Sequence, residues 1–221
     1  MKAMLLAAGR GERLRPITDE TPKPLLEVGG KALIAHLIEA LVRAGHSDIV
    51  INHAWLGAQI ETAVGNGAQF DARVRYSPEP GGALETGGGI LNALPLLGDA
   101  PFIAINADIL TDYPLARLPA DPAGLAHLVL VNNPDHNPGG DFSLEAGRVR
   151  NQGATKYTFS GIGVYRPSLF EDHPPGCFSL TPLLRAAADS GQVSGERYAG
   201  IWRDTGSAAR LDAARRDWSG A

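Results

Sequence analysis

The chain of 221 residues has one cysteine, and its aromatic residues make up only 6% of the sequence. A single cysteine, Cys177, cannot form an internal disulfide, and no Cys/His cluster has the spacing of a zinc site. The net charge of −4 excludes the bulk positive field with which proteins hold nucleic acid. No apolar run approaches the roughly 18 residues of a membrane helix. We therefore expect a cytoplasmic protein that binds neither nucleic acid nor membrane.

Glycine and proline are frequent, with 27 and 16 residues. They stand at the ends of apolar runs and follow no repeat, which excludes collagen-like and low-complexity chains. The length is sufficient for one well-buried core, and no stretch has the composition of a linker. We expect one domain over residues 1–221.

Apolar runs alternate with helical periodicities in the first half of the chain. This order predicts a doubly wound, mostly parallel α/β sheet with helices on both faces. In the second half, strands predominate, and we expect them to extend the same sheet and to form one wall of a cleft. The predicted strands are 3–8, 48–56, 73–77, 101–110, 125–132, two short ones within 142–150, 157–165 and 198–203; the predicted helices are 34–42, 58–64, 88–97, 179–188 and 207–218.

The loop after the first predicted strand combines glycine with positive charge. Gly9 and Gly11 let the backbone N–H groups approach an anion, and three arginines and Lys23 follow within the same segment. The loop is not the dinucleotide fingerprint, because Leu14 stands where a third glycine is needed, and it lacks the Gly-Lys-Ser/Thr ending of a P-loop. The pattern predicts a phosphate-binding loop; the alternative is a rigid surface turn with a solvated lysine.

The whole segment from Leu6 to Leu25, with LAAGRGERLRP, Thr18 and PKPL, resembles the signature of the sugar-1-phosphate nucleotidyltransferases. Their catalytic domain has the length of this chain. Residues 52–57 and 84–89 resemble family members that use UTP and N-acetylmuramate 1-phosphate in peptidoglycan recycling. The resemblance implies a Rossmann-like pyrophosphorylase fold, with a nucleotide-binding part at roughly 1–112 and a sugar-binding part at roughly 113–221. It also implies a reaction, in which the sugar phosphate attacks the α-phosphorus of UTP and releases pyrophosphate.

The resemblance gives roles to individual residues. Arg13 and Lys23 would be catalytic and hold the triphosphate, with help from Arg15. Glu12, where many members have threonine, is expected to turn away toward Arg10 or Arg15. The full set implied for nucleotide binding is Ala8, Gly9, Gly11, Arg13, Arg15, Lys23, Glu79, Glu85, Thr86, Gly87 and Asn106.

The segment 79–87 has the groups that a uracil edge requires. Glu79 could accept from the N3–H of the base, and backbone N–H groups near Glu85 to Gly87 could donate to its carbonyl oxygens. The alternative for Thr86 is an ordinary helix N-cap.

A metal pair is the second element that the resemblance implies. Asp108 follows a buried strand, Asp204 lies in the segment WRDTG, and together they would hold Mg²⁺, which prefers oxygen ligands. Without the resemblance, Asp204 would be interpreted as a turn residue and Asp108 as an N-cap.

The sugar site is assigned by position in the family pattern. Asp141, Ser160 and Gly161 would line it. A cation is expected to meet the carboxylate of a muramic acid substrate, and Lys156, Arg148 and Arg203 are unranked candidates, each with solvated surface charge as the alternative.

Two alternative functions stay open. The enzyme could act on another substrate, such as a glucose or heptose 1-phosphate or phosphocholine. The chain could also be a regulatory subunit that senses sugar nucleotides without turnover, although the joint presence of Lys23, Asp108 and Asp204 argues against a sensor. The six histidines and the last predicted helix are interpreted as structural.

Overall fold

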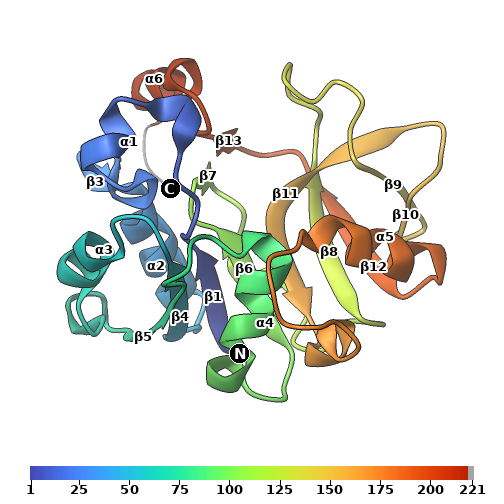
Figure 1. Ribbon diagram of the computed structural model, residues 1–221. Helices are drawn as coiled ribbons and strands as arrows, with labels where there is room; N and C mark the ends of the chain where they lie inside the picture. The colour runs from blue at the N-terminus through green and yellow to red at the C-terminus, as the bar shows by residue number, and fades with distance from the viewer. Residues whose placement is uncertain (219–221) are drawn as a thin grey trace.

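A computed structural model describes residues 1–218 (Figure 1). Four parallel strands form one half of a nine-stranded sheet, as expected for the first half of the chain. Three of these strands are nearly continuous apolar runs because helices cover both faces of the sheet, whereas the edge strand Arg73–Pro78 is only partly apolar. In spatial order they are β5 (Arg73–Pro78), β4 (Asp48–His53), β1 (Ala3–Leu6) and β6 (Phe102–Asn106).

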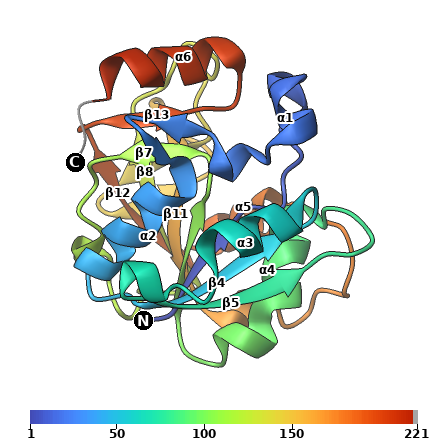
Figure 2. The same cartoon turned by 90° about the vertical axis from the view of Figure 1, so that its left-hand side faces the viewer.

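Successive side chains of β1 point into two different cores. Ala3 and Leu5 pack with α2 (Leu33–Arg43) and α3 (Gly57–Val64) on one face. Met4 packs with α4 (Glu85–Leu97) and α5 (Leu180–Asp189) on the other, and Figure 2 shows the two helix layers from the side. The period of two along a strand thus builds a three-layer arrangement.

The later strands continue the sheet in mainly antiparallel pairs. β11 (Lys156–Tyr165) pairs with β6, and the sheet goes on through β8 (Ala126–Val131), β12 (Val193–Tyr198), β10 (Arg148–Arg150) and β9 (Phe142–Glu145). Since β9 also pairs with β11, these five strands close a circuit of pairings beside the parallel half.

The predicted strands 3–8 and 48–56 end earlier, at Leu6 and His53, and two other predicted strands are divided. The apolar run 101–110 does not form one strand: β6 ends at Asn106, and β7 (Ile109–Thr111) pairs with β13 (Trp202–Asp204) in a separate small sheet. Of the expected strand at 198–203, only Tyr198 belongs to β12 and residues 202–203 to β13, so most of β12 was missed. Hydrophobicity could not mark the break after Asn106, because Ile109 is buried in the same apolar cluster as Ile103 and Ile105 of β6, and Leu110 is buried in another.

The last helix, α6 (Ala208–Asp217), packs beside the N-terminal loop. Leu211 and Ala214 of α6 share an apolar cluster with Leu14. Among the described residues, no helix combines the length and apolar character needed to cross a membrane. The remaining elements are α1 (Ile17–Glu20), β2 (Glu27–Val28), β3 (Lys31–Ala32) and short 3₁₀ turns at Glu12–Leu14, Lys23–Leu25, Ala68–Phe70, Leu115–Arg117 and Pro167–Phe170.

Candidate active site

A cavity of about 220 Å³ opens at the carboxyl ends of β1, β4 and β6, where an open α/β sheet binds its ligands. Seven residues predicted to bind nucleotide or metal line it, whereas Gly11, Arg13, Arg15, Glu79, Gly87 and Asp204 do not. The complete lining is Leu6, Ala7, Ala8, Gly9, Lys23, Pro24, Asn52, Ala83, Glu85, Thr86, Asn106, Ala107 and Asp108.

Lys23 is a buried lysine, with 8% of its surface exposed. Its Nζ donates to a carboxylate oxygen of Asp108, which lies directly after β6. A buried ammonium group needs such a partner because desolvation without one is costly. The interpretation of the Pro-Lys-Pro segment as a surface turn with a solvated lysine is therefore wrong.

Gly11 is the point on which the glycine-rich loop folds back. Its φ is +70°, a conformation that glycine adopts without strain. The carbonyl of Gly11 accepts from Thr18 Oγ1 at 2.9 Å, and a Cβ at Gly11 would lie 2.9 Å from Cγ2 of the same threonine. This close approach brings the loop against the segment that carries Lys23.

The arginines of this loop point in different directions. Arg15 forms an ion pair of 2.8 Å with Asp19, and the guanidinium of Arg10 lies 4.4 Å from the ring centroid of Trp55. Glu12 is exposed, and within residues 1–218 it pairs with neither arginine, so its expected partners were wrong. Arg13 is exposed at the surface of the loop.

Glu79 is buried, and both of its carboxylate oxygens are bonded within the protein. Oε1 accepts from the side-chain amide of Asn52 and Oε2 from the backbone N–H of Leu84, both at 2.7 Å. Asn52 accepts in turn from the N–H of Ala7 at 2.9 Å. These bonds correct the sequence-based interpretation: Glu79 supports the loop instead of presenting an acceptor to a base. Asn52 was missed, although a polar residue that ends a buried strand at this edge was a usable signal.

The start of α4 is also different from the expectation. The N-cap is Leu84, so Thr86 is not the cap. The N–H groups of Gly87 and Gly88 donate to the carbonyl of Phe178, at 3.0 and 3.1 Å. The amide predicted at Gly87 is thus already used inside the protein, and the first-turn residues that face the cavity are Glu85 and Thr86.

Three consecutive glycines let other segments approach α4 closely. A side chain at Gly87 would collide with the ring of Phe178, and one at Gly88 with the carbonyl of Gly176. A Cβ at Gly89 would lie 2.7 Å from Nδ2 of Asn52 and 2.8 Å from Oε1 of Glu79. The glycines therefore fix the position of α4 against the Asn52–Glu79 pair.

Asp108 and Asp204 are far apart in sequence but neighbours in the structure. Asp204 lies opposite Ile109 in the β7–β13 pairing, and Thr205 donates from both N and Oγ1 to the carbonyl of Asp108, at 3.0 and 2.8 Å. Two carboxylates at one edge provide hard oxygen ligands, which suit Mg²⁺ when substrate phosphates complete the shell. Residues 1–218 contain no cluster of three or more Asp, Glu, His or Cys suited to a metal, so the phosphates would be needed.

The Asp204 carboxylate already has several polar neighbours. Oδ1 accepts from the N–H of Gly206 at 2.5 Å. Oδ2 lies 3.3 Å from Nε2 of His136 and 3.5 Å from a terminal nitrogen of Arg210. Neither His136 nor Arg210 was assigned to the site from the sequence.

The predicted sugar residues are bonded mainly to their own surroundings. Ser160 is buried in the bulge of β11, where its hydroxyl donates to the Val129 carbonyl at 2.7 Å and accepts from the N–H of Ile162 at 3.1 Å. Asp141 accepts from the N–H of Phe159 at 2.8 Å. The Ser160 hydroxyl is thus used inside the protein, whereas the assignment of Asp141 to a sugar site stays a prediction.

Gly161, the third predicted sugar residue, has a φ of +81° and lies against Asn106, which lines the cavity. Of the predicted cations, Arg148 donates to the carbonyl of Gly191, and Arg203 lies 3.7 Å from Asp217. Lys156 begins β11 and is half-buried.

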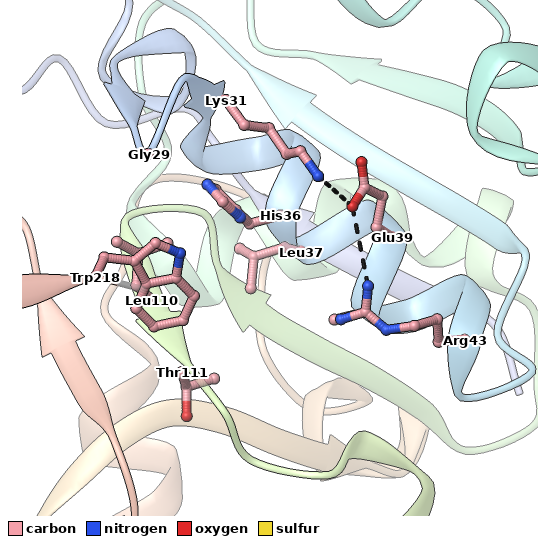
Figure 3. A pocket seen from close by; sticks show the side chains of 10 residues that line it. Gly29, Lys31, His36, Leu37, Glu39, Arg43, Leu110, Thr111 and Trp218 are labelled. Atoms are coloured by element: carbon pink, nitrogen blue, oxygen red, sulfur yellow. Dashed lines mark hydrogen bonds and ion pairs between the residues drawn. The ribbon is translucent and has the colours of Figure 1, made fainter. Parts of the chain in front are cut away.

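Further hollows lie outside this cavity, two of them beside α6 or Trp218. The larger, of about 930 Å³, lies between residues 131–136, residues 198–204 and α6, and has Asp204 and Arg210 in its wall. The smaller, of about 310 Å³, lies between α2 and Trp218, where Glu39 pairs with Lys31 at 2.5 Å and with Arg43 at 3.9 Å (Figure 3). The smaller hollow contains none of the predicted site residues.

Residues 2–138 match the family model described as nucleotidyl transferase. The chain belongs to this family and is an enzyme of the nucleotidyltransferase class, with the pyrophosphorylase type of fold. It is 50% identical to an N-acetylmuramate alpha-1-phosphate uridylyltransferase of Neisseria meningitidis over 97% of both chains. It is 36% identical to the protein of that name from Caulobacter vibrioides, over 92% of this chain and 91% of the relative.

A solved structure supports the fold. The inositol-1-phosphate CTP transferase from T. maritima has a TM-score of 0.79 with 18% identity, and the alignment covers 100% of this chain and 97% of the other. At that identity the likeness concerns the fold alone.

Proposed function

We propose that this enzyme transfers the uridylyl group of UTP to N-acetylmuramate 1-phosphate, with Mg²⁺, to give UDP-N-acetylmuramate and pyrophosphate. The names and the identity of the two relatives support this choice of substrates. The observation that carries it is the buried contact of Lys23 with Asp108 beside the glycine-rich loop. Muramic acid is a cell-wall sugar, so we place the reaction in the recycling of cell-wall fragments in the cytoplasm.

Nucleotidyl transfer requires positioning and charge stabilisation more than a covalent nucleophile. In our proposal, backbone N–H groups of the loop at Ala8 and Gly9 approach the triphosphate. Lys23 stabilises negative charge as the sugar phosphate approaches the α-phosphorus, and Arg13 contacts the phosphates that leave. Asp108 and Asp204 would hold Mg²⁺, which would supply positive charge to the reacting phosphates.

The uracil is proposed to lie along the loop that precedes α4. Ala83, Glu85 and Thr86 line the cavity there, and backbone groups of this loop would read the edge of the base. Glu79 contributes by fixing the loop through Leu84 and Asn52. In this proposal the backbone groups of the loop before α4 select the base. Glu79 acts as a positioning residue that holds this loop in place.

The test is a pyrophosphate-release assay over four nucleoside triphosphates and a set of acceptors, with Mg²⁺. The acceptors are the 1-phosphates of N-acetylmuramate, glucose and a heptose, together with phosphocholine. We expect activity to be highest with UTP and N-acetylmuramate 1-phosphate. A preference for GTP or CTP, or for another acceptor, would assign the enzyme a different substrate pair. Binding without turnover in every combination would instead support a sensor.

A further inference from the structure

Arg210 of α6 is a second guanidinium beside Arg13. The Cβ of a side chain at Gly206 would lie 3.0 Å from a terminal nitrogen of Arg13 and closer still to one of Arg210. The same point is 2.7 Å from Oδ1 of Asp204. Two arginines from opposite ends of the chain therefore meet at one glycine, with a single carboxylate between them.

Arg210 has donors that are not used within residues 1–218. Its Nε and one terminal nitrogen are buried and make no hydrogen bond, and the 3.5 Å separation from Asp204 is too long for one. The side chain is 21% exposed. Buried N–H groups of a charged side chain are costly when unpaired, so this site is suited to an additional acceptor.

The local charge also favours an anion. Arg210 and the exposed His136 contact the carboxylate of Asp204, and a terminal nitrogen of Arg13 lies near it beside Gly206. At Gly206 two guanidiniums therefore lie beside one carboxylate. If the Asp204 carboxylate binds a metal ion instead, neither Arg13 nor Arg210 has a carboxylate partner within this group of residues.

We propose that Arg210 binds the terminal phosphates of the nucleoside triphosphate, and then the leaving pyrophosphate, together with Arg13. This inference rests on the proposed function. A planar guanidinium can donate two parallel hydrogen bonds to a phosphate, which makes arginine suited to this contact. Phosphate is favoured over the carboxylate of the sugar because the buried terminal nitrogen of Arg210 lies beside Gly206, where a terminal nitrogen of Arg13 from the N-terminal loop also lies.

The experiment measures pyrophosphate binding to the whole protein by calorimetry without metal, together with the Michaelis constants for both substrates with Mg²⁺. Arg210→Gln should weaken pyrophosphate binding by about tenfold or more, the usual order for a lost charge-assisted hydrogen bond. It should raise KM for UTP and leave KM for the sugar phosphate near the wild-type value. Arg216→Gln, at an exposed position of the same helix, is the matched control and should change neither.

A double variant tests whether the two arginines hold the same group. Arg13→Gln combined with Arg210→Gln should lose less pyrophosphate affinity than the product of the two single losses, because both side chains contact one anion. Thermal melting of each variant checks that it is folded, and Arg210→Lys, which retains the charge, should recover part of the affinity.

Four results would overturn the proposal. If the wild-type protein does not bind pyrophosphate, Arg210 does not form the proposed contact. The same conclusion follows if a folded Arg210→Gln protein binds pyrophosphate as tightly as the wild type. A rise in KM for the sugar phosphate alone assigns Arg210 to the sugar acid. A higher Mg²⁺ requirement with unchanged pyrophosphate affinity makes Arg210 a support for Asp204. The proposed function fails separately, when wild type releases no pyrophosphate from any substrate pair.

Discussion

The side-chain amide of Asn52 donates a 2.7 Å hydrogen bond to the carboxylate of Glu79 and so joins the end of β4 to the loop before α4. Asn52 also accepts from the N–H of Ala7, and Glu79 accepts from the N–H of Leu84. The chain of bonds therefore runs from the glycine-rich loop side of the cavity to the side proposed for the base. It fixes the distance between the two walls.

Replacing Glu79 by glutamine tests the role of these hydrogen bonds. The side-chain amide of Gln has one oxygen that accepts and an NH₂ group that only donates, so one of the two N–H partners of Glu79 would face an N–H group. We expect a loss of unfolding free energy of about 1–3 kcal/mol. We also expect a higher KM for UTP with a smaller change in kcat, because the loop would be displaced. Chemical denaturation and steady-state kinetics measure the two effects.

Glu171→Gln is the control for the Glu79 variant, because Glu171 is exposed and should tolerate the change. If Glu79→Gln were as stable as wild type but failed to use UTP, Glu79 would contact the base directly, as the sequence suggested.

Gly89→Ala should destabilise the protein, although alanine is the better helix former. Helix propensity alone predicts a gain of about 0.5–1 kcal/mol in the unfolding free energy. The added Cβ would lie within 2.8 Å of both Asn52 and Glu79, and such overpacking costs about 1–3 kcal/mol. Thermal and urea unfolding decide between the two effects, and a higher melting temperature would show that the pair can move aside.

Lys23→Met should reduce kcat by about two orders of magnitude or more, since it removes positive charge from the reacting phosphates. Methionine keeps most of the buried side-chain volume, so the variant should remain folded. Lys31→Met is the control, because Lys31 pairs with Glu39 outside the cavity. A folded Lys23→Met enzyme with wild-type turnover would remove Lys23 from the chemistry.

Asp108→Asn and Asp204→Asn should each need more Mg²⁺ and lose most of their turnover. Both changes preserve shape and remove one negative charge from the proposed ion site. The double variant should be little slower than the slower single one, because two ligands of one ion act as a unit. Rates measured against Mg²⁺ concentration test this, with exposed Asp99→Asn as the control. If the dependence of rate on Mg²⁺ concentration were unchanged in Asp204→Asn, Asp204 would be a turn residue and not a metal ligand.

The stability of the protein should fall as the pH drops below about 6.5, in part through His127. Burial lowers the pKa of His127, against the opposing effect of the nearby Glu196 carboxylate. The unfolded chain therefore takes up this proton first, so the contribution is complete above the unfolded pKa and is lost as the pH falls toward the folded one.

The difference in unfolding free energy between wild type and His127→Gln isolates this effect. It should change with pH by at most about 1.4 kcal/mol per unit in that range. A difference that does not vary between pH 7 and pH 5 would show that His127 titrates alike in the folded and unfolded chains.

The sequence by itself determined the elements that depend on local pattern. Apolar runs and 3.6-residue periodicity indicated the parallel strands β1, β4 and β6 and the helices that cover them. The glycine-rich loop was recognisable because Gly11 and Lys23 stand at a fixed spacing after a buried strand. These features require only neighbours along the chain.

Tertiary structure alone decided which polar groups face the cavity. Glu79 and Ser160 are suitable ligands by type, but each finds its partners inside the protein through residues distant in sequence. The run 101–110 continues past its strand because different parts of it enter different cores. Arg210 reaches Arg13 because α6 packs on the N-terminal loop, a contact between two ends of the chain. Local pattern fixes which side chains are apolar and how they repeat, whereas long-range packing fixes which donors and acceptors are already paired.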